Sequence, residues 1–260
     1  MNGIINLTVF QVALAYIFVL IVLVIMRTLG IKREKELIIA SVRMTLQLIL
    51  VGYVLVYIFD NPNPFMTVGI IIIMEAFAVH TVFKKFQNKL SLPLKRVIVL
   101  SMSFGTLSCL VYFLLIVVRI SPWYMPQYFI PIAGMLIGNS MTGISLGVKL
   151  LLEGMVTQRA LVEEALILGA TPQVATRSII NNTFDAAILP TMYSMVGMGI
   201  VFLPGMMTGQ ILSGTAPTTA ISYQIAIMLG ILGAVALTVI IMLQLGYRTF
   251  FNKEDQLQSL

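Results

Sequence analysis

The chain has 260 residues, of which 59% are hydrophobic and only 10% charged, and its mean hydropathy is +1.00. Charged residues make up about a quarter of a soluble domain, so this composition excludes an ordinary soluble protein and predicts an all-α integral membrane protein. The formal net charge of +6 is expected to face anionic lipid headgroups rather than nucleic acid. A single cysteine excludes a disulfide within one chain.

Seven apolar runs are each long enough to cross a hydrocarbon core of about 30 Å. In chain order they cover residues 4–26, 37–59, 65–83, 97–118, 129–148, 187–207 and 221–247. The short loops between them leave little room for a soluble domain. We therefore expect about seven transmembrane helices and one membrane domain over residues 1–260.

Basic residues gather in alternate loops. The loops at 27–36, 84–96 and 149–186, together with the tail from Arg248, hold 14 of the 16 Lys and Arg residues. Basic loops stay on the cytoplasmic side of a membrane. This pattern therefore places the N-terminus outside, the C-terminus in the cytoplasm, and the 149–186 loop in the cytoplasm between the fifth and sixth spans.

Polar side chains inside the second and third spans are candidates for function, because charge at membrane depth is costly and tends to mark pathways. Arg43 and Gln47 share one helix face, although Arg43 could also extend to the cytoplasmic interface. Glu75 is either a pathway carboxylate or a structural partner of Arg43. His80 follows five residues after Glu75, about 140° away around the helix, so it is either an interfacial residue or a metal ligand.

The fifth and sixth spans carry further polar and sulfur-containing groups. Asn139, Ser140 and Thr142 either bond neighbouring helices or line a pathway. Met192, Met195 and Met198 recur every three residues and are either flexible packing or ligands for a soft metal ion. The candidate metal ligands are therefore Glu75, His80 and Met195. The candidate pathway residues are Arg43, Gln47, Asn139, Met192 and Met198.

Small residues on the fifth span, among them Gly143 and Gly147, repeat the spacing that lets two helices approach closely. They serve either packing within the chain or a homodimer interface.

The longest charged interval, residues 158–190, precedes the sixth span. It predicts a helix over 158–168 that ends at Gly169, and a second helix that Thr171 and Pro172 begin. Acidic residues disfavour an anionic membrane surface, so we expect the first helix to enter a groove on another protein rather than to lie on lipid.

The run Glu163-Glu164-Ala165-x-x-x-Gly169 resembles the coupling loop by which ABC importer permeases contact their ATPase. Leu189-Pro190 follows later than in those importers, which argues against an ordinary importer. The resemblance assigns Glu163, Glu164, Ala165 and Gly169 to a coupling segment at about 150–186.

A second resemblance covers nearly the whole chain. The motifs KEL at 35–37, VRxxxQL at 42–48, IGNSM at 137–141, EEALxLGATP at 163–172 and LPGMMTGQIL at 203–212 resemble the Fet-type (UPF0014-like) family of ABC permeases. Plant relatives of that family are linked to aluminium tolerance. The resemblance implies a multi-pass permease of the bacterial plasma membrane that exports iron or another metal ion, and it leaves a small organic solute such as a nucleotide sugar as the alternative.

No G-x-x-x-x-G-K-[ST] phosphate-binding loop occurs in the sequence. We therefore expect a transport subunit rather than an enzyme, with no cofactor of its own and with ATP hydrolysed by a partner chain. ABC machines use two ATPase sites, so two copies of the chain are expected to form a homodimer. The competing interpretation is an ion-driven carrier or channel, which would favour several acids facing one another within the membrane.

Overall fold

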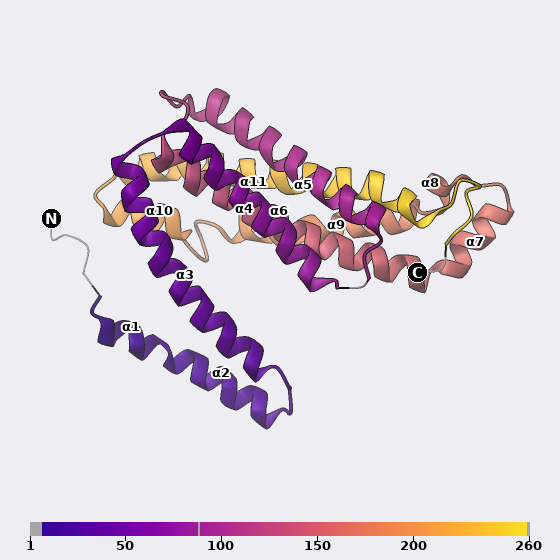
Figure 1. Ribbon diagram of the computed structural model, residues 1–260, viewed down its shortest axis with the longest axis horizontal. Helices are drawn as coiled ribbons and strands as arrows, with labels where there is room; N and C mark the ends of the chain where they lie inside the picture. Colours follow the sequence, from indigo (N-terminus) through magenta and orange to yellow (C-terminus); the bar gives the residue numbers. More distant parts are fainter. Residues whose placement is uncertain (1–6, 88, 259–260) are drawn as a thin grey trace. The chain divides into compact units, whose positions relative to one another are not determined.

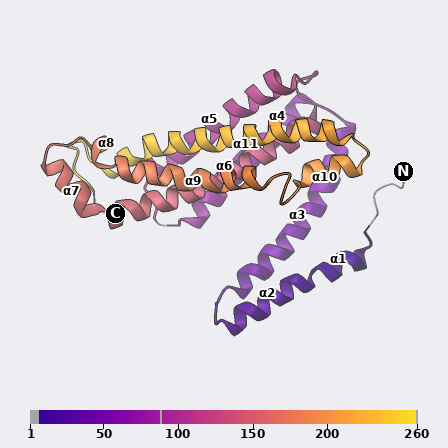
Figure 2. The same cartoon turned by 180° about the vertical axis from the view of Figure 1, so that it is seen from behind.

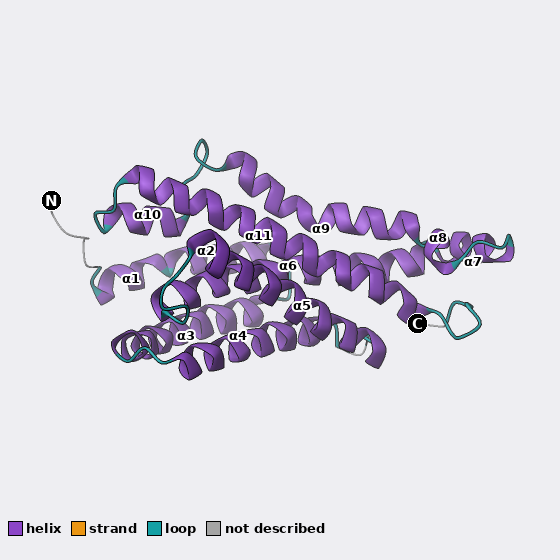
Figure 3. Ribbon diagram, turned by 90° about the horizontal axis from the view of Figure 1, so that it is seen from above, coloured by secondary structure: helices purple, strands orange, loops and turns teal. Residues whose placement is uncertain are grey.

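The computed structural model describes residues 7–87 and 89–258, and the chain forms two compact units. Of the described residues, 7–62 and 212–214 form the first unit, and 63–87, 89–211 and 215–258 form the second. Within the described residues the regular elements are all helices (Figure 3). The expected all-α fold is therefore confirmed.

The first unit is a helical hairpin of α1 (Val9–Ala15), α2 (Ile17–Thr28) and α3 (Glu34–Asp60). Thr8 and Gln11 form a capping box that begins α1. The hydroxyl of Tyr16, between α1 and α2, is hydrogen-bonded to the hydroxyl of Thr45 on α3. No side chain of α2 is buried, as suits an apolar helix that faces lipid.

The second unit is a bundle of long helices (Figure 1). Its members are α4 (Pro64–Lys85), α5 (Leu92–Tyr112) with a π-helical extension η1 (Phe113–Val118), α6 (Pro126–Thr157), α9 (Arg177–Gly197), α10 (Gly205–Leu212) and α11 (Pro217–Gly246), which ends in the 3-10 turn η2 (Tyr247–Phe250). The short helices α7 (Arg159–Ile167) and α8 (Pro172–Ala175) connect α6 to α9. Helix α6 packs against α4, α5, α9 and α11, so it is the centre of the bundle.

Small residues allow the closest helix contacts of this bundle. A Cβ atom on Gly105 of α5 would come within 2.8 Å of the Cα atom of Thr238 on α11. On α6, Cβ atoms at Gly143 and Gly147 would come within 2.8 Å of side-chain carbons of Val235 and Met242, again on α11. The close-approach spacing of α6 therefore serves packing within the chain, which was one of the two expectations.

Six helical segments of the described chain are long and apolar enough to cross a membrane. They are Val9–Thr28, Glu34–Asp60, Pro64–Lys85, Leu92–Val118, Pro126–Thr157 and Pro217–Phe250. The expected number of seven is not confirmed, and the orientation of the termini stays a prediction.

The expected sixth span, at 187–207, is not one continuous helix. Helix α9 begins earlier, at Arg177, and ends at Gly197. Gly199 then adopts a left-handed conformation with φ of +83°, and Pro204 precedes the start of α10. Figure 2 shows α10 continuing beyond this break in the direction of α9. The correction follows from local chemistry, because Gly favours the left-handed turn and Pro lacks the N–H donor that a continuous helix needs.

Candidate functional site

In the α7–α8 hairpin, residues 159–175, hydrogen bonds close the turn between the two helices. Helix α7 ends in a Schellman motif, in which the N–H of Gly169 donates to the carbonyl of Leu166 (3.0 Å) and the N–H of Ala170 to that of Ala165 (2.9 Å). Gly169 has φ of +88°, a conformation that glycine adopts without a steric penalty. The expected helix end at Gly169 is therefore confirmed, and Pro172 begins α8 as expected.

The hairpin turns apolar side chains outward. Val162 is buried, with 1% of its surface exposed, and anchors α7 to the bundle. By contrast, Ile167 is 85% and Leu168 is 88% exposed, although both lie outside the six segments that could cross a membrane. Large apolar groups exposed beside acidic ones are typical of a surface that binds another protein.

The two acids of the hairpin are placed differently. The Nε atom of Arg159 donates to Oε1 of Glu163 at 2.8 Å, in a half-exposed pair one helical turn apart. Glu164 is exposed. Helix α8 packs against η2 at the end of α11, and Figure 1 shows α7 and α8 at one end of the second unit.

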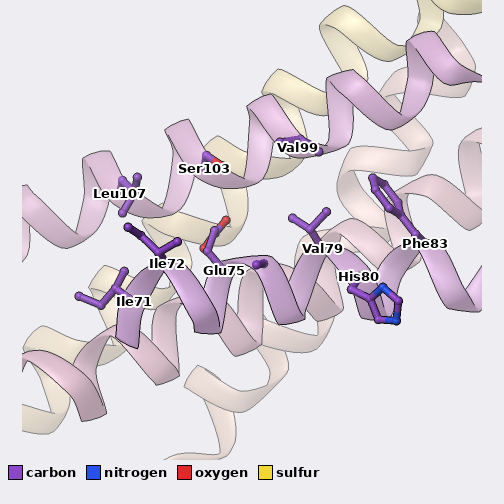
Figure 4. A pocket seen from close by; sticks show the side chains of 10 residues that line it. Ile71, Ile72, Glu75, Val79, His80, Phe83, Val99, Ser103 and Leu107 are labelled. Carbon is purple, nitrogen blue, oxygen red and sulfur yellow. The ribbon is translucent and has the colours of Figure 1, made fainter. Parts of the chain in front are cut away.

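Glu75 lies at the base of a groove between α4 and α5, with a volume of about 500 Å³ (Figure 4). The hydroxyl of Thr106 donates to Oε2 of Glu75 (3.1 Å) and also lies 2.7 Å from the carbonyl of Met102. Oε1 of Glu75 is buried without a partner. The Thr106 hydroxyl thus divides its one proton between two acceptors, and the buried carboxyl group of Glu75 is incompletely hydrogen-bonded in a mainly apolar groove.

The three predicted metal ligands are not gathered in one place. His80 lines the same groove as Glu75, but the two side chains point in different directions (Figure 4). Met195 lies on α9, which does not line this groove. In the described part of the chain, no group of three or more His, Cys, Asp or Glu residues could hold a metal ion. Arg43 and Gln47 lie on α3 of the first unit and are exposed.

A second cavity, of about 290 Å³, opens where the chain breaks between α9 and α10. It lies among α6, α9, α10 and α11, and we call it the break cavity. Of the predicted pathway residues, Asn139 and Met198 line it. Met192 does not line it and is 43% exposed.

Gln224 of α11 also lines the break cavity and is absent from the residues predicted from sequence. It is a buried polar residue. The sequence signal for Gln224 is an uncharged amide inside an apolar run. Only the contact between α11 and α9 shows that Gln224 lies at the cavity.

Comparison with known proteins identifies the family. The model of the family described as "Uncharacterised protein family (UPF0014)" matches residues 9–251. The Escherichia coli protein named "Probable iron export permease protein FetB" is 33% identical over 253 residues, which are 97% of this chain and 95% of that protein. No solved structure matches the chain.

Two further relatives match along nearly their whole length. The Bacillus subtilis protein "UPF0014 membrane protein YjkA" is 33% identical over 96% of this chain and 98% of its own. The Arabidopsis thaliana "Protein ALUMINUM SENSITIVE 3" is 35% identical over 95% of this chain and 89% of its own. With six apolar helices and a family match along most of its length, the chain is a multi-pass membrane protein, which in a bacterium lies in the plasma membrane, and it belongs to the UPF0014 family.

Proposed function

We propose that the chain is the permease subunit of an ABC transporter that exports iron or another metal ion with a separate ATPase subunit. The observation that carries this proposal is the α7–α8 hairpin. Its turn exposes Ile167 and Leu168 beside Glu164, outside the segments that could cross a membrane. Covering one such apolar side chain stabilises a complex by about 1.5–3 kcal/mol.

The contacts of the α7–α8 hairpin connect its movement to that of α9. Val162 anchors α7, and α8 packs against η2. Only Thr176 separates α8 from α9, and its buried hydroxyl donates to the carbonyl of Pro172 at 2.8 Å. A partner that moves the hairpin therefore moves α9, and α9 carries Ser194 and ends beside Met198 at the break cavity.

The remaining parts of the proposal rest on the relatives and on ABC chemistry. The name of the Escherichia coli relative supports iron export. The sequence has no phosphate-binding loop of its own, so the energy is proposed to come from the partner. Two ATPase sites call for two permease copies, which gives a homodimer in the membrane.

Co-purification with the candidate ABC ATPase of the same genome tests the coupling assignment. Glu163→Ala with Glu164→Ala, and separately Ile167→Ser with Leu168→Ser, should each reduce the ATPase recovered with the chain by at least about tenfold, which corresponds to roughly 1.4 kcal/mol. The half-exposed Arg159–Glu163 pair contributes at most about 1 kcal/mol to folding, so the variants should stay folded.

Glu34→Ala with Glu36→Ala is the matched control. It removes the same charge from the first turn of α3 and should leave ATPase recovery unchanged. Full ATPase recovery by both hairpin variants would contradict the coupling assignment. ATP-dependent movement of ferrous iron in vesicles that contain both subunits then tests the substrate, and a complex that hydrolyses ATP without moving any metal would contradict metal export.

A further inference from the structure

The break cavity has polar side chains but no charged residue in its lining. Asn139 and Thr142 come from α6, Thr191 and Ser194 from α9, and Gln224 from α11. The thioethers of Met198 and Met206 lie at the break itself. Uncharged polar groups beside an interrupted helix are a common way to bind a solute within a membrane, because the break frees backbone and side chains from helix packing.

Three of these side chains donate a proton to a carbonyl of their own helix. The amide nitrogen Nδ2 of Asn139 donates to the carbonyl of Met135 at 2.7 Å. The hydroxyl of Thr142 donates to the carbonyl of Gly138 at 3.1 Å, and the hydroxyl of Ser194 donates to the carbonyl of Pro190 at 2.9 Å. A hydroxyl has one proton and a carbonyl can only accept, so the remaining hydrogen-bonding capacity of the two hydroxyl oxygens is acceptor capacity, as is that of the amide oxygen of Asn139.

Gln224 strengthens this pattern. It is 6% exposed, and its Nε2 atom lies 3.7 Å from the thioether sulfur of Met198. A thioether has no proton to donate, so in this contact the amide nitrogen of Gln224 is the donor and the sulfur the acceptor. The amide oxygen, Oε1, is buried without a hydrogen-bond partner. A buried unsatisfied acceptor costs about 1–3 kcal/mol.

Asn139, Thr142, Ser194 and Gln224 therefore offer oxygen acceptors, and the methionines add sulfur. Such a set suits a cation and gives an anionic solute no charged partner. The thioethers favour soft or borderline metal ions, and amide and hydroxyl oxygens are ligands that many cations accept. Neutral ligands also hold a cation weakly enough for it to leave, as a transport pathway requires.

We propose that the break cavity is the cation site of the transport pathway, where the side-chain oxygens of Gln224 and Asn139 and the thioether of Met198 ligate a soft or borderline metal ion such as ferrous or cuprous ion. This inference rests on the proposed function and gives it a location. Met198 lies where α9 ends, so a displacement of α9 changes the distance between the sulfur and Gln224 on α11.

Equilibrium binding to the purified full chain in lipid nanodiscs tests the site, with ferrous ion alone or cuprous ion alone under anaerobic conditions. Loss of a group that only orients a metal ligand weakens metal binding by ~10–100-fold, so Gln224→Leu and Met198→Leu should each weaken it by at least about 10-fold. Gln224→Glu adds a negative charge at the same position and should tighten binding. A merely structural role for Gln224 would not give opposite effects of Leu and Glu. Comparison of the two ions shows which one the site takes.

Met192→Leu is the matched control, because Met192 lies on α9 but outside the cavity. This variant should bind metal as tightly as the wild type. X-ray absorption of the bound metal should show a sulfur neighbour that Met198→Leu diminishes. If Gln224→Leu does not fold, Met198→Leu and Gln224→Glu still decide the question.

Unchanged metal affinity in both Met198→Leu and Gln224→Glu would overturn the site, as would metal binding that Glu75→Gln abolishes and these variants leave intact. No binding of either ion by the wild type would also overturn it. In each of these cases the permease assignment stands or falls separately, on recovery of the ATPase with the chain.

Discussion

The turn at Gly169 allows a prediction whose size follows from one backbone angle. Its φ of +88° is left-handed, and no heavy atom lies within 4 Å of the place where a Cβ atom would be. Gly169→Ala therefore adds backbone strain without a clash, at a cost of roughly 1–2 kcal/mol. That strain favours local opening of the hairpin, and opening frees the N–H groups of Gly169 and Ala170 from their hydrogen bonds to Leu166 and Ala165.

Amide hydrogen exchange in nanodiscs measures this opening. A cost of 1–2 kcal/mol corresponds to a factor of about 5–30 in the equilibrium, so exchange of these two amides should accelerate by that factor. Gly169→Asn should accelerate exchange less, because Asn tolerates the left-handed region. Gly138→Ala has a helical backbone and open space around it, and it should leave the hairpin unchanged. Unaltered protection in Gly169→Ala would refute the reasoning.

Two further predictions concern the bundle. Gly105→Leu should separate α5 from α11, because its Cβ atom alone would meet the backbone of Thr238; we expect a fall in thermal stability in detergent, and an unchanged melting temperature would count against this packing. Glu75→Gln keeps an oxygen for the hydroxyl of Thr106 but removes the group that can ionise or bind a cation. It should therefore slow metal movement in vesicles while leaving ATPase recovery unchanged, and normal transport would give Glu75 a structural role.

Most of the helices could be predicted from the sequence because apolar length alone defines a membrane span. The turn of the hairpin was also predictable, since Gly169 and Thr171-Pro172 are local signals for the end and the start of a helix. Both features depend on neighbours in the sequence.

Apolar length does not predict the break between α9 and α10. Residues 187–207 are apolar enough to be read as one span, and the count of apolar residues hides the local effect of Gly197, Gly199 and Pro204. Gly197, Gly199 and Pro204 together predict the break when they are weighed against the apolar run.

The site residues were harder to predict because they meet across helices. The sequence identifies Asn139 and Met198 only as isolated polar or sulfur-containing candidates for the pathway. The fold brings both to one cavity. Gln224 is an isolated amide in an apolar run, and its place in the cavity follows only from the packing of α11 against α9. Met195 and His80 have suitable chemistry for a metal ligand, but their helices direct them to different places.

The hydroxyl groups that donate to their own helix backbone also bear on how the protein is made. Thr142 of α6 and Thr238 of α11 each donate their hydroxyl proton to the carbonyl four residues back along the same helix. Such a helix can leave the translocon and enter lipid singly, because its polar groups need no neighbour. Glu75 and Gln224 differ, since each depends on a residue of another helix. Biogenesis of this protein should therefore be limited by the late association of α4 with α5 and of α11 with α9, and not by insertion of the individual helices.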